Sequence, residues 1–472
     1  MTSYKGYIMT IGLEVHVELK TDSKIFCSCS TDFGASANTQ TCPICLGMPG
    51  TLPVMNIKVV EYAIMAGLAT DCKISLNSKM DRKNYFYPDL PKAYQISQYD
   101  MPLCINGYLD IVTAEGEKRI NITRIHLEED AGKLIHDDEK GTMIDCNRCG
   151  VPLIEIVTEP DFESTEQVGI FLNKLRTILL NLGISDCRMN EGSFRADVNL
   201  SVRKETDKLL GTRTEMKNLN SFAFIQKAIE YEFVRQVDSL LADKKIVQET
   251  RRYDEKNKKT YSMREKEDAD DYRYFPDPDL VPINLTDEYV QSIKRILPIL
   301  AKDKKPQIMK KYGLSSFDSE MLVSDMKISV LYETAASLTS AYKTLANLMI
   351  PLSEKALEIK AERWAVIADM TDKDQINTTT AKKLIDMLLK EDFDPKQQVK
   401  IKNMFQINDI QKLKEYVTKA ISLNAKSVES FKSGNIQAMG PIVGYVMKIT
   451  KGCANPSKVN EIVLDMLKDM DI

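Results

Sequence analysis

The pattern of polar and apolar positions changes along the chain. Up to about residue 290, short alternating stretches are punctuated by Gly, Pro, Asn and Asp. Such stretches predict strands, because successive strand side chains point to opposite faces of a sheet. After Pro298, apolar residues recur at three- and four-residue spacing, as in Leu338, Tyr342 and Leu345, which predicts helices. We therefore expect an α+β protein in which a strand-rich body precedes a helical region.

The end of the chain carries a helix start of its own. Asn455-Pro456 is typical of an N-cap and first helical position, and an apolar stripe from Val459 to Met470 follows it. We expect three domains: a strand-rich body over residues 1–293, a helical middle over 294–408 and a small helical tail over 409–472.

Several predicted strands place charged side chains on one face. In residues 12–18, Glu14, His16 and Glu18 share a face, while apolar residues line the other. Glu155 interrupts the apolar run 152–157, where a solvated carboxylate is unexpected. The other polar residues on such faces are Arg195, Asp197, Asn199, Ser201 and Arg203, then Arg213, Glu215 and Lys217, then Arg124, His126 and Glu128, with Glu129 on the opposite side.

A single strand of this kind is best explained as the solvated face of an antiparallel sheet. Four such strands, which combine carboxylates, imidazole, amide and guanidinium, favour another interpretation. Mg²⁺ and Mn²⁺ prefer oxygen ligands and tolerate histidine, and nearby Arg and Lys neutralise a phosphoryl group. The sequence has no Walker-type phosphate loop, so we expect any ATP site to be built on the sheet.

Two close cysteine pairs predict a metal site. Cys27-x-Cys29 and Cys42-x-x-Cys45 are separated by twelve residues, a spacing that allows four thiolates to bind one structural Zn²⁺ in a knuckle over residues 27–45. The alternative is four unrelated buried thiols. The further pair Cys146-x-x-Cys149 is weak evidence for a redox pair or a second metal site, and two small buried residues remain the favoured interpretation.

Composition narrows the function classes. The chain has 472 residues, 64 Lys and Arg against 68 Asp and Glu, and a formal net charge of −4. A protein with this charge does not coat nucleic acid nonspecifically, so RNA contacts must come from local groups. We expect no membrane span and no signal peptide, because no apolar run is long enough. Ten cysteines, six of them in close pairs, indicate a reduced cytoplasmic protein with a metal site.

Longer motifs closely resemble the B subunits of the aspartyl/glutamyl-tRNA amidotransferases, the GatB family, and the match runs essentially end to end. The motifs that carry the resemblance are residues 12–18, 81–89, 91–98, 126–133, 152–157, 217–222, 248–252, 270–276 and 448–456. The resemblance implies a cradle-shaped α+β catalytic domain related to glutamine synthetase and guanidino kinases, with an antiparallel sheet. A helical domain and a YqeY-like tRNA-binding tail follow it, where Lys432, Lys448 and Lys451 are the local basic residues.

The resemblance also implies a reaction and partners. A heterotrimer forms with an amidase-type A subunit, which releases ammonia from glutamine or asparagine, and a small C subunit. With ATP and Mg²⁺, the B subunit phosphorylates the side-chain carboxylate of glutamate or aspartate misacylated onto tRNA(Gln) or tRNA(Asn). Ammonia then displaces phosphate. The sequence leaves open which of the two misacylated tRNAs is the substrate.

Site residues carry over by motif. Glu14, His16, Glu129 and Glu155 correspond to groups around the catalytic Mg²⁺ and the ammonia exit, with Glu128 as a further candidate. Residues implied at the nucleotide and phosphate are Arg195, Asp197, Glu215 and Lys217, and residues matching the zinc-binding subset of the family are Cys27, Cys29, Cys42 and Cys45. The pair Cys146/Cys149 departs from the usual family pattern.

Two other function classes stay open at this point. One is a ligase that acts on free glutamate, as glutamine synthetase does, although the helical tail and the lack of an ammonia source disfavour it. The other is a noncatalytic zinc-knuckle scaffold that binds tRNA, which leaves Glu14, His16, Glu129 and Glu155 without a role.

Overall fold

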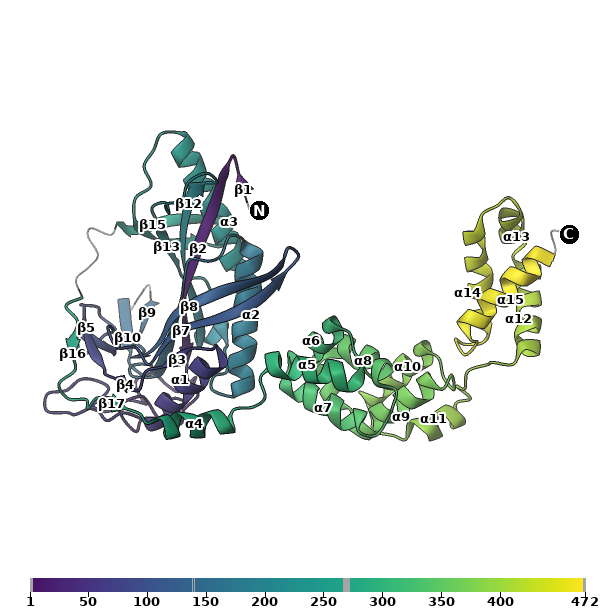
Figure 1. Ribbon diagram of the computed structural model, residues 1–472, viewed down its shortest axis with the longest axis horizontal. Coiled ribbons are helices and arrows are strands. Elements are labelled where there is room, and N and C mark those ends of the chain that lie inside the picture. Colours follow the sequence, from purple (N-terminus) through teal and green to yellow (C-terminus); the bar gives the residue numbers. More distant parts are fainter. Residues whose placement is uncertain (1–2, 138, 140, 266–271, 470–472) are drawn as a thin grey trace. The chain divides into compact units, whose positions relative to one another are not determined.

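The computed structural model describes residues 3–469 except 138, 140 and 266–271. The chain divides into two compact units, Met1–Leu300 and Ala301–Ile472. Every named strand of the described chain lies in the first unit, and the named elements of the second are helices (Figure 1). This arrangement confirms the α+β prediction, with a strand-rich body before a helical region.

The first unit is built on one large sheet. In spatial order its strands are β15 (Lys259–Glu265), β14 (Glu249–Asp254), β13 (Thr214–Lys217), β12 (Phe194–Lys204), β2 (Tyr7–Glu18), β11 (Pro152–Thr158), β8 (Gly116–Glu129), β7 (Cys104–Thr113) and β3 (Lys73–Ile74), and β1 (Ser3–Tyr4) pairs with β2. Smaller sheets pair β10 (Gly141–Asp145) with β9 (Lys133–Asp137), β5 (Asp81–Asn84) with β6 (Tyr94–Ser97) and β16 (Phe275–Pro276), and β17 (Ile283–Asn284) with β4 (Asn77–Ser78).

The described helices of the first unit cover one face of this sheet. They are α1 (Ile57–Ala69), α2 (Thr165–Leu182), α3 (Phe222–Leu241) and α4 (Asp287–Ile296), with a short 3₁₀ turn η1 (Met189–Glu191). The apolar positions of β2, such as Leu13, Val15 and Val17, are at most 1% exposed and belong to the same core as α1, α2 and α3. Because strand side chains alternate, the polar positions of β2 lie on the other face, which these helices leave open (Figure 1).

One pair of strands departs from the antiparallel sheet that the resemblance implied. β13 and β14 are parallel, whereas the other pairings in the large sheet are antiparallel. The reason is the connection: α3 lies between them in sequence, and parallel neighbours need a crossover of this length. Ser221 caps the N-terminus of α3 by accepting a hydrogen bond from the Phe224 backbone N–H.

The second unit contains two apolar cores. Trp364 and Tyr332 are fully buried in the first, and Val446 and Val463 in the second. Its helices are α5 (Ala301–Tyr312), α6 (Ser316–Val323), α7 (Met326–Ala336), α8 (Tyr342–Met349), α9 (Ala361–Asp372), α10 (Thr378–Leu388), α11 (Pro395–Ile401), α12 (Ile410–Leu423), α13 (Ala425–Lys432), α14 (Met439–Ile449) and α15 (Pro456–Asp469), with 3₁₀ segments η2 (Ile350–Glu358) and η3 (Ile436–Ala438).

The last helix starts where the sequence predicted. Pro456 opens α15, and the Asn455 side chain accepts hydrogen bonds from the backbone N–H groups of Ser457 and Lys458. Among the described residues of the whole chain, no helix combines the length and the apolar character needed to cross a membrane.

Candidate active site

The open face of the large sheet carries a row of charged side chains across four neighbouring strands. Arg195 on β12 lies opposite His16 on β2, His16 lies opposite Glu155 on β11, and Glu155 lies opposite His126 on β8. Residues directly opposite each other on antiparallel strands have Cβ atoms about 5 Å apart. Four segments that are distant in sequence therefore present one continuous row of functional groups.

Two carboxylates and two imidazoles of this face form a cluster. His16 Nε2 lies 3.4 Å from both Glu128 Oε1 and Glu155 Oε2, and His126 Nε2 lies 3.4 Å from Glu155 Oε2 and 3.8 Å from Glu128 Oε2. Glu128 and His126 are 2% and 3% exposed. Arg124, on the same side of β8, donates from Nε to His126 Nδ1. We refer to His16, His126, Glu128 and Glu155 as the histidine–glutamate cluster.

The charges in this cluster depend on one another. Burial alone would lower the pKa of His16, but a hydrogen bond to Glu155 and the charges of Glu155 and Glu128 raise it to about 9. Burial also opposes the charge on His126, yet Glu155 and Glu128 raise its pKa. In turn, the two histidines hold the pKa of Glu155 well below its usual range, although burial would raise it. The Glu155 carboxylate thus stays ionised at neutral pH, with positive charge beside it.

A divalent cation fits the same place. One ligand atom from each of His16, Glu128 and Glu155 lies within 4.8 Å of the others. One divalent cation supplies the positive charge that two buried carboxylates need, and oxygen with imidazole nitrogen is a ligand set that Mg²⁺ and Mn²⁺ accept. The residues present therefore match the hard cation that the sequence predicted.

A second acidic group lies on the same face, towards β13. Ligand oxygens of Glu14, Asp197 and Glu215 are within 4.8 Å of one another. Lys217 Nζ lies 2.6 Å from Asp197 Oδ2 and 2.9 Å from Glu215 Oε1. Burial opposes the charge on Lys217, but these two carboxylates raise its pKa. Burial and the nearby charge of Glu155 raise the pKa of Glu14, which connects this group with the histidine–glutamate cluster.

Arg195 is held by an acidic residue that the sequence did not single out. Its Nη2 donates to Asp130 Oδ2 at 2.9 Å, and Arg148 Nε lies 3.2 Å from the same oxygen. Burial and the neighbouring Asp130 carboxylate raise the pKa of Glu18 to about 7. Asp130 therefore fixes the guanidinium of Arg195 at the end of the polar row.

Glu129 does not join the cluster. Adjacent strand residues point to opposite faces, and Glu129 instead accepts hydrogen bonds from Lys92 Nζ at 2.6 Å and from the Ile96 backbone N–H at 2.9 Å. It lines a cavity of about 210 Å³ together with Lys24, Cys45 and Lys92. Of the two acidic neighbours, the structure brings Glu128 to His16 and Glu155.

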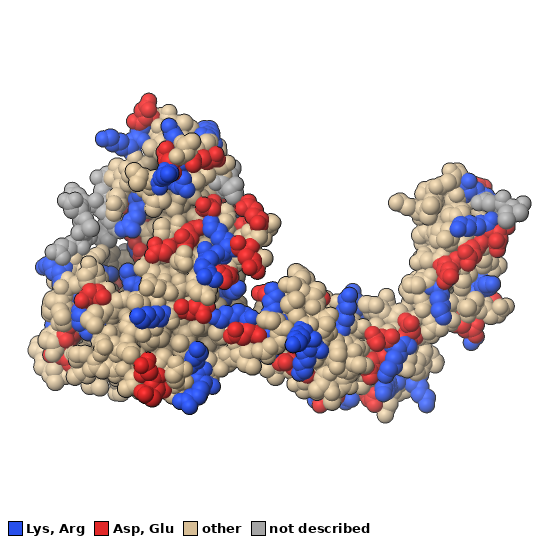
Figure 2. All heavy atoms as spheres, in the orientation of Figure 1, with Lys and Arg blue, Asp and Glu red and all other residues tan. Residues whose placement is uncertain are grey.

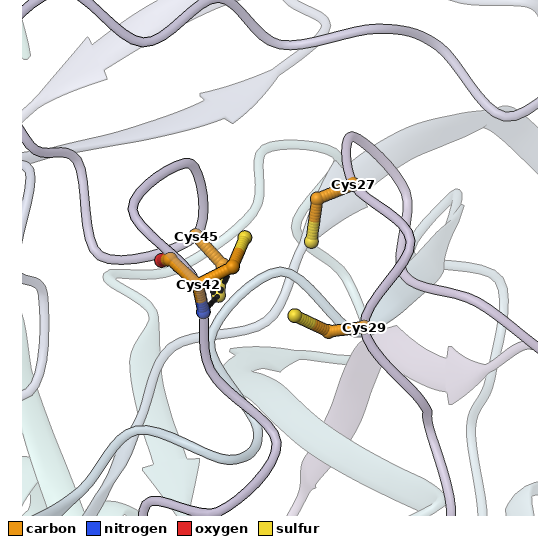
Figure 3. A group of neighbouring side chains, drawn as sticks. All are labelled: Cys27, Cys29, Cys42 and Cys45. Carbon is orange, nitrogen blue, oxygen red and sulfur yellow. Dashed lines mark hydrogen bonds between the residues drawn. The ribbon is translucent and has the colours of Figure 1, made fainter.

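The four predicted cysteines come together (Figure 3), and two of them, Cys27 and Cys45, line this cavity. One Sγ from each of them lies within 4.8 Å of the others, and Cys42 and Cys45 are 3.9 Å apart at sulfur. A tetrahedral zinc site with Zn–S bonds of about 2.3 Å separates its sulfurs by about 3.8 Å. Hydrogen bonding from Cys27 lowers the pKa of Cys45 to about 4. The set fits a structural Zn²⁺ ion.

A buried lysine and a second cysteine pair support this knuckle. Lys24 is fully buried, donates to the Gln40 carbonyl at 2.7 Å and lies 3.6 Å from Cys45 Sγ. The turn that contains Cys146 and Cys149 is hydrogen-bonded to the same loop, with Gln40 N–H donating to Asn147 Oδ1 at 2.8 Å. Cys149 is 3% exposed.

Comparison with known proteins decides the family. Residues 9–291 match the GatB/GatE catalytic domain, and residues 325–467 match the GatB domain. The chain belongs to the GatB family. It is 53% identical over 476 residues to the B subunit of the aspartyl/glutamyl-tRNA(Asn/Gln) amidotransferase of Caldicellulosiruptor saccharolyticus, covering 98% of this chain and 99% of that protein.

Other members of the GatB family give the same result. The corresponding B subunits of Lachnospira eligens and Carboxydothermus hydrogenoformans are 48% and 47% identical, each over 98% of this chain and 100% and 99% of their own lengths. The family resemblance expected from the sequence is therefore confirmed along the whole chain.

Proposed function

We propose that this chain is the B subunit of a tRNA-dependent amidotransferase and converts Glu-tRNA(Gln), Asp-tRNA(Asn) or both into Gln-tRNA(Gln) and Asn-tRNA(Asn). The proposal includes an acyl-phosphate intermediate. A side-chain carboxylate oxygen attacks the γ-phosphorus of ATP and ADP leaves. The nitrogen of ammonia then attacks the acyl carbon, loses a proton to solvent, and inorganic phosphate leaves. Family membership and the names of the relatives support the overall reaction.

The single observation that carries the chemistry is the histidine–glutamate cluster on the open face of the sheet. His16, Glu128 and Glu155 would hold Mg²⁺, which when bound supplies positive charge to the transferring phosphoryl group. Glu14, the next polar residue on β2, lies between this cluster and Lys217. These acidic residues would hold a divalent cation over the centre of the sheet, and the cation would hold the phosphate there.

Arg195, Asp197, Glu215 and Lys217 are the proposed contacts of the nucleotide and its phosphates. A phosphoryl group gains negative charge on its oxygens as it transfers, and fixed cations stabilise that charge. Arg195 and Lys217 are each held by a carboxylate at 2.9 Å or less. The side chains of Arg195 and Lys217 are therefore already held in place and need no rearrangement when the phosphates bind.

Ammonia would come from an amidase-type A subunit, with a small C subunit completing a heterotrimer. Glu129 keeps its proposed place at the ammonia exit, and the cavity that it lines beside Lys92 supports that role. A structural Zn²⁺ at Cys27, Cys29, Cys42 and Cys45 would fix the knuckle next to this cavity. We infer a cytoplasmic location, because translation, which consumes ATP and aminoacyl-tRNA, takes place in the cytoplasm.

The three-domain organisation also stays a proposal: a catalytic domain over residues 1–293, a helical domain over 294–408 and a tRNA-binding tail over 409–472. Two separate apolar cores in the helical unit support a division there. Basic and acidic side chains are interspersed on the face drawn in Figure 2. RNA recognition would therefore depend on shape and on local groups.

The test is conversion of both misacylated tRNAs by this chain co-expressed with its A and C partners, with ATP and glutamine supplied. Product from either tRNA supports the proposal and defines the specificity. If tRNA binds but neither product forms while the partner releases ammonia, the noncatalytic scaffold is correct instead. ATP hydrolysis with free glutamate and without tRNA would favour the small-molecule ligase.

A further inference from the structure

Four tyrosines beside the histidine–glutamate cluster form a connected row. Tyr99 and Tyr274 stack with ring centroids 4.3 Å apart and an interplanar angle of 10°. Tyr274 meets Tyr272 edge to face at 6.2 Å, and Tyr272 meets Tyr85 in the same way at 6.0 Å. We call Tyr85, Tyr99, Tyr272 and Tyr274 the tyrosine platform.

Three segments distant in sequence build this platform. Tyr85 directly follows β5, Tyr99 lies two residues after β6, and Tyr272 and Tyr274 precede β16. β5 pairs with both β6 and β16, and Asn84 donates from its side chain to the Arg273 carbonyl at 2.8 Å. The rings are thus held by a small sheet and not by a single loop.

The platform adjoins the cluster and is open at Tyr99. Burial and the charges of Glu128 and Glu155 raise the pKa of Tyr274, and Glu128 acts on Tyr85 in the same direction. The backbone shows the same proximity: the Leu127 N–H, next to Glu128, donates to Gln98 Oε1 at 3.0 Å, and Gln98 directly precedes Tyr99. Tyr99, at one end of the row, is 61% exposed, and Phe86, which follows Tyr85 at the opposite end, is 91% exposed.

A cation accompanies the rings. Lys83 Nζ lies 4.8 Å from the ring centroid of Tyr272 and 5.7 Å from that of Tyr85. Aromatic rings and a basic side chain together bind single-stranded nucleic acid in many proteins, because every base has a face that stacks and every nucleotide has a phosphate.

We propose that the tyrosine platform binds the unpaired 3′ end of the aminoacyl-tRNA by stacking its terminal bases. This inference rests on the proposed function and specifies where its substrate enters. In an aminoacyl-tRNA the amino acid is esterified to the terminal ribose, so a terminal base on the platform brings the side-chain carboxylate towards Glu128 and Glu155. The platform and the cluster then hold the two ends of the same aminoacyl-nucleotide.

The assembled complex with its partner subunits can be tested with tRNA that carries 2-aminopurine as the terminal base. Stacking quenches the fluorescence of this analogue, so binding should quench it in the wild-type complex. Tyr99→Ala should abolish most of the quenching, whereas Tyr99→Phe should retain it. Tyr274→Ala and Tyr274→Phe provide the same comparison at the ring that stacks on Tyr99. Tyr108→Ala is the matched control, because Tyr108 lies on β7 and contacts Arg119 instead.

The kinetic expectation is a higher KM for misacylated tRNA. Stacking of one base contributes about 1–3 kcal/mol, which corresponds to roughly a 5- to 150-fold rise in KM for Tyr99→Ala. With tRNA that lacks its terminal nucleotide, wild type and Tyr99→Ala should bind equally, because the group that stacks is gone.

Three results would overturn the inference. Amidation by wild type without quenching would reject the platform and leave the proposed function standing. A loss of partner subunits from the purified Tyr99→Ala complex would identify the platform as a protein interface. Equal quenching in wild type and both alanine variants would place the terminal base elsewhere. Platform-dependent quenching without amidation of either tRNA would instead refute the proposed function and keep the stacking site.

Discussion

Removal of one buried charge, Glu232, tests how the strands that carry Glu215 and Lys217 are held. Glu232 on α3 is fully buried. Its carboxylate accepts hydrogen bonds from Arg235 at 2.6 and 2.9 Å and from Thr214 and Thr260, each at 2.9 Å. The carboxylate therefore connects α3 with β13 and β15, next to the proposed phosphate contacts.

We expect Glu232→Gln to lower the stability of the first unit substantially. Loss of one partner of a buried ion pair costs about 3–5 kcal/mol, because the guanidinium groups of Arg235 and Arg251 are left to share Glu249 as their carboxylate partner. At about 2–3 °C per kcal/mol for a unit of this size, the midpoint of its unfolding should fall by roughly 6–15 °C. Differential scanning calorimetry measures the midpoint, and hydrogen exchange in β13–β15 assigns the transition.

The pH dependence gives an independent check on Glu232. Burial would raise its pKa, but hydrogen bonds from Arg235 and Gln236 and the charge of Arg251 lower it. A carboxyl with a lowered folded-state pKa stabilises the protein above its unfolded pKa, about 4.3, and loses that contribution as the pH falls through the folded value. The difference between wild type and Glu232→Gln should therefore be full at pH 7 and shrink below about pH 4.

The matched control for this prediction is Glu230→Gln, which lies on the same helix but is exposed. It should shift the midpoint by less than about 1.5 °C, since exposed substitutions usually change stability by at most about 0.5 kcal/mol. If Glu232→Gln unfolds at the same temperature as Glu230→Gln, the buried network does not stabilise this unit and the reasoning is wrong.

Three further predictions concern other parts of the chain. Glu155→Gln should reduce the rate of amidation, measured with both misacylated tRNAs, by about 100-fold or more. The control Glu117→Gln changes an exposed residue at the far end of β8 and should react at nearly the wild-type rate. Equal rates for Glu155→Gln and Glu117→Gln would reject the cluster as the cation site. Metal analysis of anaerobically purified protein should find about one Zn²⁺ per chain in wild type and none in Cys42→Ser. Wild-type protein without zinc would contradict the proposed zinc site. Asn455→Ala should destabilise α15 by about 1 kcal/mol, with faster hydrogen exchange over residues 456–469, and unchanged exchange would show that the cap contributes nothing.

Much of the fold follows from local patterns in the sequence. The predicted strands 12–18, 152–157 and 195–203 lie within β2, β11 and β12. The first and the last alternate between the core and the open face, and 152–157 is a short, mostly buried apolar run. Asn455 caps α15 as expected, since N-cap chemistry is local. The parallel pairing of β13 with β14 was not predicted. It depends on where α3 packs, and strand alternation contains no information about neighbours.

The sequence predicted which types of residue form the site, but it did not predict how they are arranged. Alternation alone placed Glu14 and His16 on one face, and the structure has both on the open face, in two neighbouring groups of ligands. The importance of His126 was missed, although it shares a face with Glu128, because the register that sets it opposite Glu155 is a long-range property of the sheet. Asp130 was missed for a different reason: it follows the end of β8, where the alternation stops.

The adjacent residues Glu128 and Glu129 show how much depends on strand parity. Both are buried carboxylates in one acidic motif, at 2% and 3% exposure, and composition cannot distinguish them. Their side chains leave β8 on opposite sides, one to two histidines and the other to Lys92. Each carboxylate thus has its own cationic partner, as buried charge requires. A single strand therefore separates a cluster suited to a divalent cation from a cavity beside the cysteine knuckle, and the chemistry of each side can change without disturbing the other.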